Sequence, residues 1–161
     1  MKTLGFVLIS VLLASSSAFA VGTSSSGSSS GASSGSSKSS SEPVTAADWY
    51  NTGYRLSQSD KYTEAVLDFK KAISINANYA EAYNMLGYCT RKLGNVQEAF
   101  GYYDKALSLK PNFPEAREYY GEAYLQSGDL TKAVQQYVIL QKAGNKNAKE
   151  LLEKIDEYVN K

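Results

Sequence analysis

The feature that most constrains this chain is internal repetition at an offset of 34 residues, where Gly53 coincides with Gly87 and Gly121. Further positions of matching residue class align at the same offset: Trp49 with Tyr83 and Arg117, Ala65 with Ala99 and Ala133, Phe69 with Tyr103 and Tyr137, Ala72 with Ala106, and Asp60 with Gly94 and Gly128. Self-similarity of this length is typical of stacked repeats. We therefore predict three units, at residues 46–79, 80–113 and 114–146.

Each unit divides into two amphipathic stretches with helical spacing. In the first unit, Trp49, Gly53 and Leu56 follow i, i+4, i+7 spacing, and a second stripe begins at Ala65. Segments rich in Gly, Ser, Asn or Asp separate the two stretches of each unit: 57–60, 92–95 and 126–129. The pattern predicts an all-α chain of helix–turn–helix units.

The small aligned residues indicate close packing between helices. Gly inside a helix costs about 1 kcal/mol relative to Ala, so an aligned series needs a packing reason. We predict that Gly and Ala let helices approach closely and that aromatic rings fill the remaining spaces. The predicted packing set is Trp49, Gly53, Ala65, Phe69, Ala72, Tyr83, Gly87, Ala99, Tyr103, Ala106, Gly121, Ala133 and Tyr137.

The third unit ends differently from the other two. Leu140 stands where Ala72 and Ala106 stand earlier, which argues against a fourth closely packed helix pair. Residues 147–159 instead follow the pattern of one amphipathic helix, with Leu151, Leu152, Ile155 and Val159 expected to face inward. We predict that residues 147–161 form a capping helix at the end of the stack.

The N-terminal segment predicts export. Residues 1–20 resemble a secretory signal peptide, with Lys2, an apolar run and an Ala-Phe-Ala cleavage pattern at 18–20. The run of about eleven apolar residues is shorter than the ~20 that a spanning helix needs. We expect an extracytoplasmic protein, periplasmic or secreted, without stable membrane insertion after cleavage; an uncleaved signal anchor is the alternative.

A Ser- and Gly-rich linker is expected next, over residues 21–45. Residues 22–41 contain 13 Ser and 4 Gly. Such side chains bury too little apolar surface to offset the entropy of ordering the backbone. The segment is therefore predicted to be a disordered spacer, with or without sugars attached to its serines.

Composition excludes several kinds of chemistry. The chain has no His, one Cys, and 17 basic against 16 acidic residues. It therefore has no His base or His metal ligand, no internal disulfide and no excess of positive charge for nucleic acid. Because no nucleophile, metal or phosphate motif is found either, we expect no enzyme, metal or cofactor, and we expect Cys89 to be a buried apolar residue.

The repeat unit resembles the tetratricopeptide repeat (TPR). The openings of units one and two, 46–53 and 80–87, and the dipeptides at 64–65, 98–99 and 132–133 carry the resemblance, which covers residues 46–143. The family implies a right-handed superhelix of helix pairs with a concave groove, used as a scaffold for protein or peptide binding.

In this family the first helix of each unit faces the groove. The resemblance therefore implies these groove residues: Tyr50, Tyr54, Ser57, Glu81, Asn84, Tyr88, Arg91, Glu115, Glu118, Glu122 and Leu125. One end of this surface is aromatic and the other is acidic. We expect an extended polar and aromatic ligand with a basic end, while Tyr83, Tyr103, Tyr124 and Tyr137 are expected in packing.

A subtype of the family holds the C-terminal carboxylate of chaperones with Lys, Asn and Arg. The corresponding places here are Tyr50, Tyr54, Met85, Glu115 and Tyr119, so no basic clamp is expected.

Two function classes follow from these observations. The first is an exported scaffold that binds a protein or peptide segment in the groove. The second is a self-associating structural or cell-envelope subunit that uses its outer surface or cap. Carbohydrate binding through the Tyr surface is a third possibility, supported only by the aromatic content.

Overall fold

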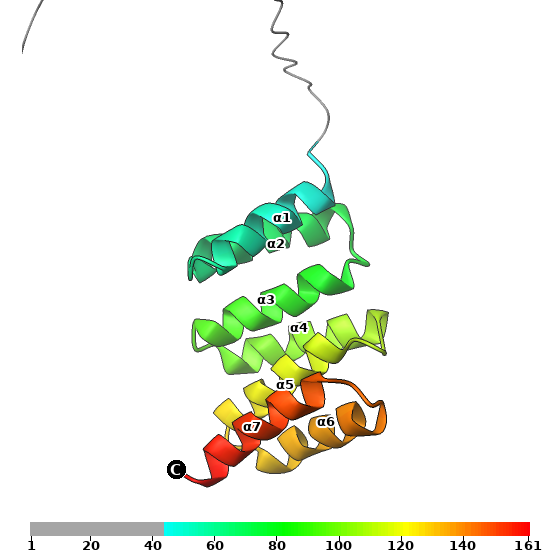
Figure 1. The fold of residues 1–161 in the computed structure, drawn as a ribbon. Helices are drawn as coiled ribbons and strands as arrows, with labels where there is room; N and C mark the ends of the chain where they lie inside the picture. The colour runs from blue at the N-terminus through cyan, green and yellow to red at the C-terminus, as the bar shows by residue number, and fades with distance from the viewer. Residues whose placement is uncertain (1–43) are drawn as a thin grey trace, which may run out of the picture. The chain divides into compact units, whose positions relative to one another are not determined.

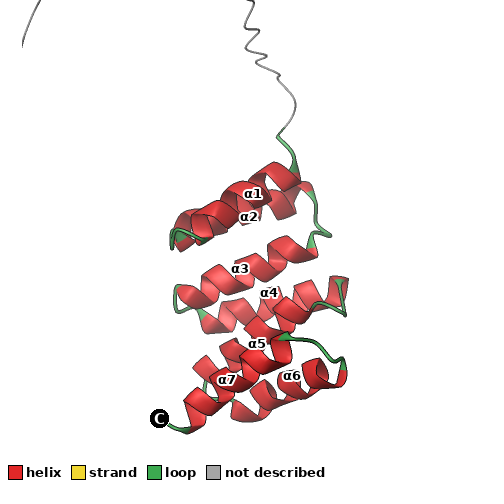
Figure 2. Ribbon diagram, in the orientation of Figure 1, coloured by secondary structure: helices red, strands yellow, loops and turns green. Residues whose placement is uncertain are grey.

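The computed structural model describes residues 44–161, and in this range it contains seven helices and no strand (Figures 1 and 2). The predicted signal peptide and nearly all of the predicted linker lie outside the described residues. The helices are α1 Ala46–Ser57, α2 Tyr62–Ile75, α3 Ala80–Lys92, α4 Val96–Leu109, α5 Pro114–Gln126, α6 Leu130–Lys142 and α7 Asn147–Val159.

The helices pack as successive neighbours in a stack (Figure 1). Pairs α1/α2, α3/α4 and α5/α6 form the three units; α2 also contacts α3, and α4 contacts α5. The last helix, α7, packs on both α5 and α6. This arrangement confirms the predicted all-α repeat fold with a terminal helix.

Local sequence signals mark the helix ends. Thr45 caps α1: its hydroxyl accepts a hydrogen bond from the Asp48 amide at 3.2 Å, and its own amide donates to the Asp48 carboxylate at 2.8 Å. Asp60, Gly94 and Gly128, aligned by the repeat, all adopt positive φ, at 56°, 89° and 85°. Gly takes this conformation without strain and Asp tolerates it, which explains the residue types at the turn.

Two of the aligned glycines lie directly against an aromatic ring of their own unit. A Cβ atom built on Gly53 would lie 3.0 Å from Phe69, and one on Gly87 would lie 2.6 Å from Tyr103. Both rings are fully buried. A side chain at Gly87 would therefore require the ring or the helices to shift, and one at Gly53 would require a smaller adjustment.

The third glycine has a different neighbour. A Cβ atom on Gly121 would lie 2.5 Å from Leu151, which comes from α7. Tyr137, at the place of Phe69 and Tyr103, is only partly buried, and its hydroxyl accepts a hydrogen bond from Gln141 at 2.8 Å. The capping helix thus occupies a space that an aromatic ring occupies in the first two units.

Several side chains are more exposed than the sequence pattern predicted. Leu152 and Val159 were expected to face inward, but they are 36% and 60% exposed. The inward face of α7 consists of Asn147, Ala148, Leu151 and Ile155, which are all buried. The amphipathic pattern predicted the helix correctly, but the prediction that Leu152 and Val159 belong to its buried face was wrong.

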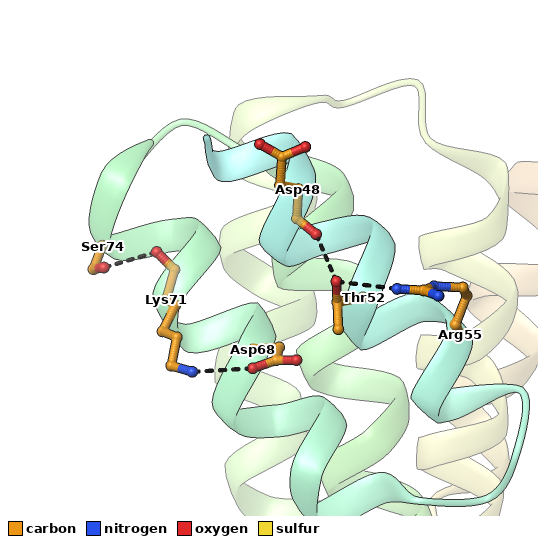
Figure 3. Close-up of polar contacts among 6 residues, drawn as sticks. All are labelled: Asp48, Thr52, Arg55, Asp68, Lys71 and Ser74. Atoms are coloured by element: carbon orange, nitrogen blue, oxygen red, sulfur yellow. Dashed lines mark hydrogen bonds and ion pairs between the residues drawn. The ribbon is translucent and has the colours of Figure 1, made fainter. Parts of the chain in front are cut away.

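The N-terminal end of the stack carries polar side chains (Figure 3). Thr52 donates a hydrogen bond to the Asp48 carbonyl at 3.0 Å, and Arg55 donates to the Thr52 hydroxyl at 3.4 Å. Lys71 pairs with Asp68 at 3.2 Å and also lies 3.7 Å from the centre of the Trp49 ring. These contacts lie on the first helix pair of the described residues, 44–161.

Candidate functional site

The first helices of all three units contribute to one cavity of about 330 Å³, which we call the aromatic pocket. Its lining residues are Tyr50 and Tyr54 of α1, Glu81, Asn84 and Met85 of α3, Lys110 and Phe113 of the α4–α5 connection, and Glu115 and Tyr119 of α5. Five of the eleven predicted groove residues line it: Tyr50, Tyr54, Glu81, Asn84 and Glu115.

Aromatic rings form one wall of the pocket. The Tyr50 ring lies 6.2 Å from the Tyr54 ring and 5.0 Å from the Tyr79 ring, between ring centres. Burial raises the pKa of Tyr50 to about 12, and burial also raises the pKa of Tyr119 to about 12. Both hydroxyls therefore stay protonated at neutral pH and can donate hydrogen bonds to a ligand.

The pocket also carries charge of both signs. Lys110 Nζ donates a hydrogen bond to Glu81 Oε1 at 2.7 Å and lies 4.4 Å from the centre of the Phe113 ring. This hydrogen bond holds the pKa of Glu81 below its ordinary value. Glu115 is exposed nearby, so two carboxylates and one ammonium group give the lining a formal charge of −1.

Asn84 supplies a hydrogen-bond acceptor in the pocket wall. The residue is 4% exposed, and its Oδ1 atom has no hydrogen-bond partner among the described residues. Leaving a buried amide oxygen unpaired costs about 1–3 kcal/mol. A ligand N–H group at this position would relieve that cost.

Several predicted groove residues are instead buried between helices. Arg91 is 7% exposed and forms an ion pair with Glu122 at 2.8 Å, joining α3 to α5. Ser57 and Leu125 are also buried, and the Ser57 hydroxyl donates to the Tyr54 carbonyl at 2.7 Å. These side chains belong to the packing of the stack and present little surface to a ligand.

Glu118 is a further correction, because α7 covers it. It is 8% exposed and accepts a short hydrogen bond from the Asn147 side chain. Burial raises the pKa of Glu118 to about 7, and the hydrogen bond from Asn147 partly opposes that shift. The predicted acidic end of the groove is thus partly an attachment point for the capping helix.

Tyr88 lies outside the pocket as well. Its ring packs against Tyr62 at 6.0 Å and against Tyr119 at 5.2 Å, between ring centres. It therefore joins the first pair to the third through aromatic contacts and supports the pocket wall at Tyr119.

Lys110 and Phe113 line the pocket although the sequence pattern did not predict them there. Both lie after the end of a second helix, whereas the family resemblance points only to first helices. The position of Lys110 matches Asn76 at the repeat offset, so the repeat gives no separate sign of it. Lys110 places one basic group in the pocket, where its ion pair with Glu81 distinguishes it from the cluster of basic residues in a carboxylate clamp.

Residues 44–161 offer no metal site and no membrane-spanning helix. This part of the chain holds no group of three or more acidic or Cys side chains placed to bind a metal ion. None of its helices has the length and apolar character needed to cross a bilayer. Cys89 is fully buried, and burial raises the pKa of its thiol to about 12, so it packs as an apolar residue.

Family models identify the repeats. A model described as a tetratricopeptide repeat matches residues 90–155, and one described as a TPR repeat matches residues 53–89. No curated protein sequence shows significant similarity to the chain.

Solved structures share the fold. The type III secretion translocator chaperone SycD of Yersinia enterocolitica is 21% identical, with a TM-score of 0.63, covering 71% of this chain and 89% of that one. The first TPR domain of human RPAP3 is 20% identical, with a TM-score of 0.65, covering 73% and 94%. MamA is 30% identical, with a TM-score of 0.55, covering 71% of this chain and 63% of MamA.

Two similar structures are described with bound peptides: SycD with a peptide of the translocator YopD, and RPAP3 with an HSP90 peptide. Both are less than 25% identical to this chain, so these likenesses show a shared fold. The repeat matches, the helix pairs and the structural likenesses agree that this chain is a tetratricopeptide repeat protein.

Proposed function

We propose that this chain is a non-catalytic exported scaffold that binds an extended protein segment in the aromatic pocket. The observation that carries the proposal is the convergence of α1, α3 and α5 on one cavity with a tyrosine wall and a buried, unpaired amide oxygen at Asn84. Tyrosine provides contact area at low entropic cost and a hydroxyl donor, which suits a polypeptide ligand.

The pocket lining indicates the chemistry of the ligand. A ring or aliphatic side chain of the ligand would pack against Tyr50, Tyr54 and Tyr119. A Lys or Arg of the ligand would face Glu115 and Glu81, where the net charge of the lining is negative. A main-chain N–H would reach Asn84, so an extended segment with an aromatic and a basic residue fits best.

Export is part of the same proposal. The signal-like pattern at residues 1–20 supports it, and the Ser- and Gly-rich segment at 21–45 would separate the repeat domain from whatever holds its N-terminus. Antibody detection of the repeat domain in the extracytoplasmic fraction, with a mass lacking residues 1–20, tests this part. Retention of the full-length chain in the cytoplasm would contradict it.

Selection from a displayed library of random peptides tests the binding site. We expect enrichment of peptides that combine an aromatic residue with Lys or Arg. The substitution Tyr54→Ala should weaken the selected peptides about tenfold or more, because removal of a central aromatic contact is costly. Fluorescence anisotropy with a labelled selected peptide measures the change.

Tyr102→Ala is the matched control for that experiment. Tyr102 is a partly buried tyrosine of α4, outside the pocket, whose hydroxyl donates to Glu98 at 2.8 Å. Its removal should leave peptide affinity unchanged. Equal loss in both variants, or no loss in Tyr54→Ala, would show that the pocket is not the binding site.

A further inference from the structure

The outward side of α7 forms a stripe that no helix of the described chain covers. Lys149, Leu152, Asp156 and Val159 follow one another at intervals of three, four and three residues. That spacing places them along one line of a helix, as in the contact seam of a helix pair. Leu152 and Val159 in this α7 stripe are 36% and 60% exposed.

A shallow hollow of about 410 Å³ lies beside the stripe. Tyr137 and Gln141 of α6, the α6–α7 connection at 144–146, and Ala148, Lys149 and Leu152 line it. Tyr137 is the aromatic residue that Leu151 displaces from the Gly121 site. The end of the stack therefore offers a stripe with two exposed apolar side chains, Leu152 and Val159, next to a partly exposed aromatic ring.

The N-terminal end of the stack differs in this respect. At the repeat offset, Asp48 corresponds to the fully buried Ala82, and Thr52 corresponds to the fully buried Leu86. Polar residues thus replace apolar ones in the first unit of the described chain, and Figure 3 shows the hydrogen bond that Thr52 donates to the Asp48 main-chain carbonyl. In the α7 stripe, Leu152 and Val159 remain apolar although no helix of the described chain covers them.

We infer that the α7 stripe is a self-association surface, on which two copies of this chain pair through antiparallel α7 helices. The order of charges along the stripe is the reason for proposing a second copy as the partner. Lys149 comes before Leu152 and Asp156 comes after it, so opposite charges face each other only when two copies lie antiparallel. With the two-fold axis near Leu152, Lys149 of each copy faces Asp156 of the other, and the two leucines meet between these pairs. The same arrangement brings Val159 of each copy to the hollow beside Tyr137 of the other.

The contact is small, so the dimer should be weak and reversible. Interfaces well below about 1,200 Å² belong to transient complexes. Within one chain, Lys149 Nζ lies 3.7 Å from Glu153 Oε1, and both side chains are mostly exposed. Exposed ion pairs of this kind are weak, so Lys149 remains available to a partner. The aromatic pocket lies on α1, α3 and α5, so pairing through α7 does not depend on the proposed peptide binding.

Sedimentation velocity of the purified chain, over about 1 µM to 1 mM, tests the inference, since a weak dimer is populated only at high concentration. We expect the weight-average mass to rise from monomer toward dimer. Leu152→Glu should keep the chain monomeric, because two carboxylates would meet at the axis. Leu67→Glu is the matched control: Leu67 is a 58% exposed leucine of α2, and its substitution should leave the dimer unchanged.

A charge exchange then tests the antiparallel orientation. Lys149→Glu alone and Asp156→Lys alone should each weaken the dimer, and the double variant should restore it. Residues seven apart on one helix are separated by about 10 Å along its axis, so they do not pair within one chain. Restoration would therefore report contact between two copies.

Three results would overturn the inference. They are a monomer at every concentration, a dimer that persists in Leu152→Glu, and a double variant no better than the single ones. Circular dichroism of each variant verifies that its helices are intact. Peptide binding in the aromatic pocket is measured separately, so failure of one proposal leaves the other standing.

Discussion

The first two helix pairs and the third solve the same packing problem with different side chains. Gly53 and Gly87 each receive an aromatic ring from the second helix of their own pair, whereas Gly121 receives Leu151 from α7. The first two pairs are thus completed internally, and the third is completed by the capping helix. The comparison teaches that a repeated glycine preserves the space between helices but does not determine which side chain fills it.

The largest expected effect is at the middle glycine. In Gly87→Ala, the new methyl group would lie 2.6–2.8 Å from three atoms of the Tyr103 ring, which is fully buried and has no room to move. We expect the free energy of unfolding to fall by about 3 kcal/mol, since overpacking outweighs the better helix propensity of Ala. Urea denaturation followed by circular dichroism measures the change.

A second substitution identifies the cause of that loss. Replacing Tyr103 by Leu removes the ring atoms closest to Gly87, so Gly87→Ala should cost much less in the Tyr103→Leu background. If the losses of unfolding free energy in the double variant were additive, contact with the Tyr103 ring would not be the cause of the loss in Gly87→Ala.

The next effect concerns the attachment of α7 to the third pair. Burial raises the pKa of Glu118 to about 7 from an ordinary value of 4.5, with Glu150, Glu122 and Glu115 adding to the rise. The folded protein therefore holds a proton on Glu118 more tightly than the unfolded chain does. The resulting stabilisation is fully present below pH 4.5 and is lost as the pH rises through about 7.

The charged and titratable residues around Glu118 come from α5 and α7. They are Glu115, Tyr119 and Glu122 of α5 and Glu150 of α7; Arg91 of α3 pairs with Glu122.

Glu118→Gln should remove this pH dependence, because its amide oxygen can still accept the hydrogen bond from Asn147. Relative to the variant, the wild-type chain should lose on the order of 2 kcal/mol of unfolding free energy between pH 5 and pH 8. Denaturation at a series of pH values measures the difference. Glu115→Gln, at an exposed carboxyl, is the matched control; equal behaviour of both variants would place the effect elsewhere.

The smallest expected effect is at the third glycine. The atoms nearest to a methyl group on Gly121 would be the two terminal carbons of Leu151, a flexible aliphatic side chain on the helix at the end of the stack, whereas Gly87 faces a rigid ring. We expect Gly121→Ala to change the unfolding free energy by less than about 1 kcal/mol, because relief at Leu151 and the helix propensity of Ala offset the crowding. The same urea titrations compare Gly121→Ala with Gly87→Ala. An equal loss of unfolding free energy in both variants would contradict the proposed difference between the second and third helix pairs.

Most of the fold could be predicted from the sequence because it depends on features that recur. Gly53, Gly87 and Gly121 and the alanines 34 residues apart report distances between neighbouring helices, and those distances set the stack. The exception is α7, where Leu152 and Leu151 look equally apolar in the sequence. Only the rotation of α7 against α5 and α6 decides which of the two is buried, and no repeat constrains that rotation.

The candidate site was less predictable for a related reason. Tyr50, Tyr54 and Glu81 follow from the first-helix positions, but Lys110 reaches the pocket from a connection between units. Glu118 looked like an open groove residue because its burial depends on Asn147, 29 residues later. Contacts that occur once, between non-equivalent positions, leave no periodic trace in the sequence.

The buried ion pair between Arg91 and Glu122 has a mechanical consequence. It ties α3 to α5, whereas the equivalent places between α1 and α3 hold Ser57 and Tyr88, which carry no charge. We expect the first helix pair to move relative to the other two pairs. Tyr50 and Tyr54 of α1 would then move toward a bound peptide, while the pocket wall formed by α3 and α5 stays rigid. Slower amide hydrogen exchange in α3 than in α1 would agree with movement of the first pair alone, and equal exchange rates would contradict it.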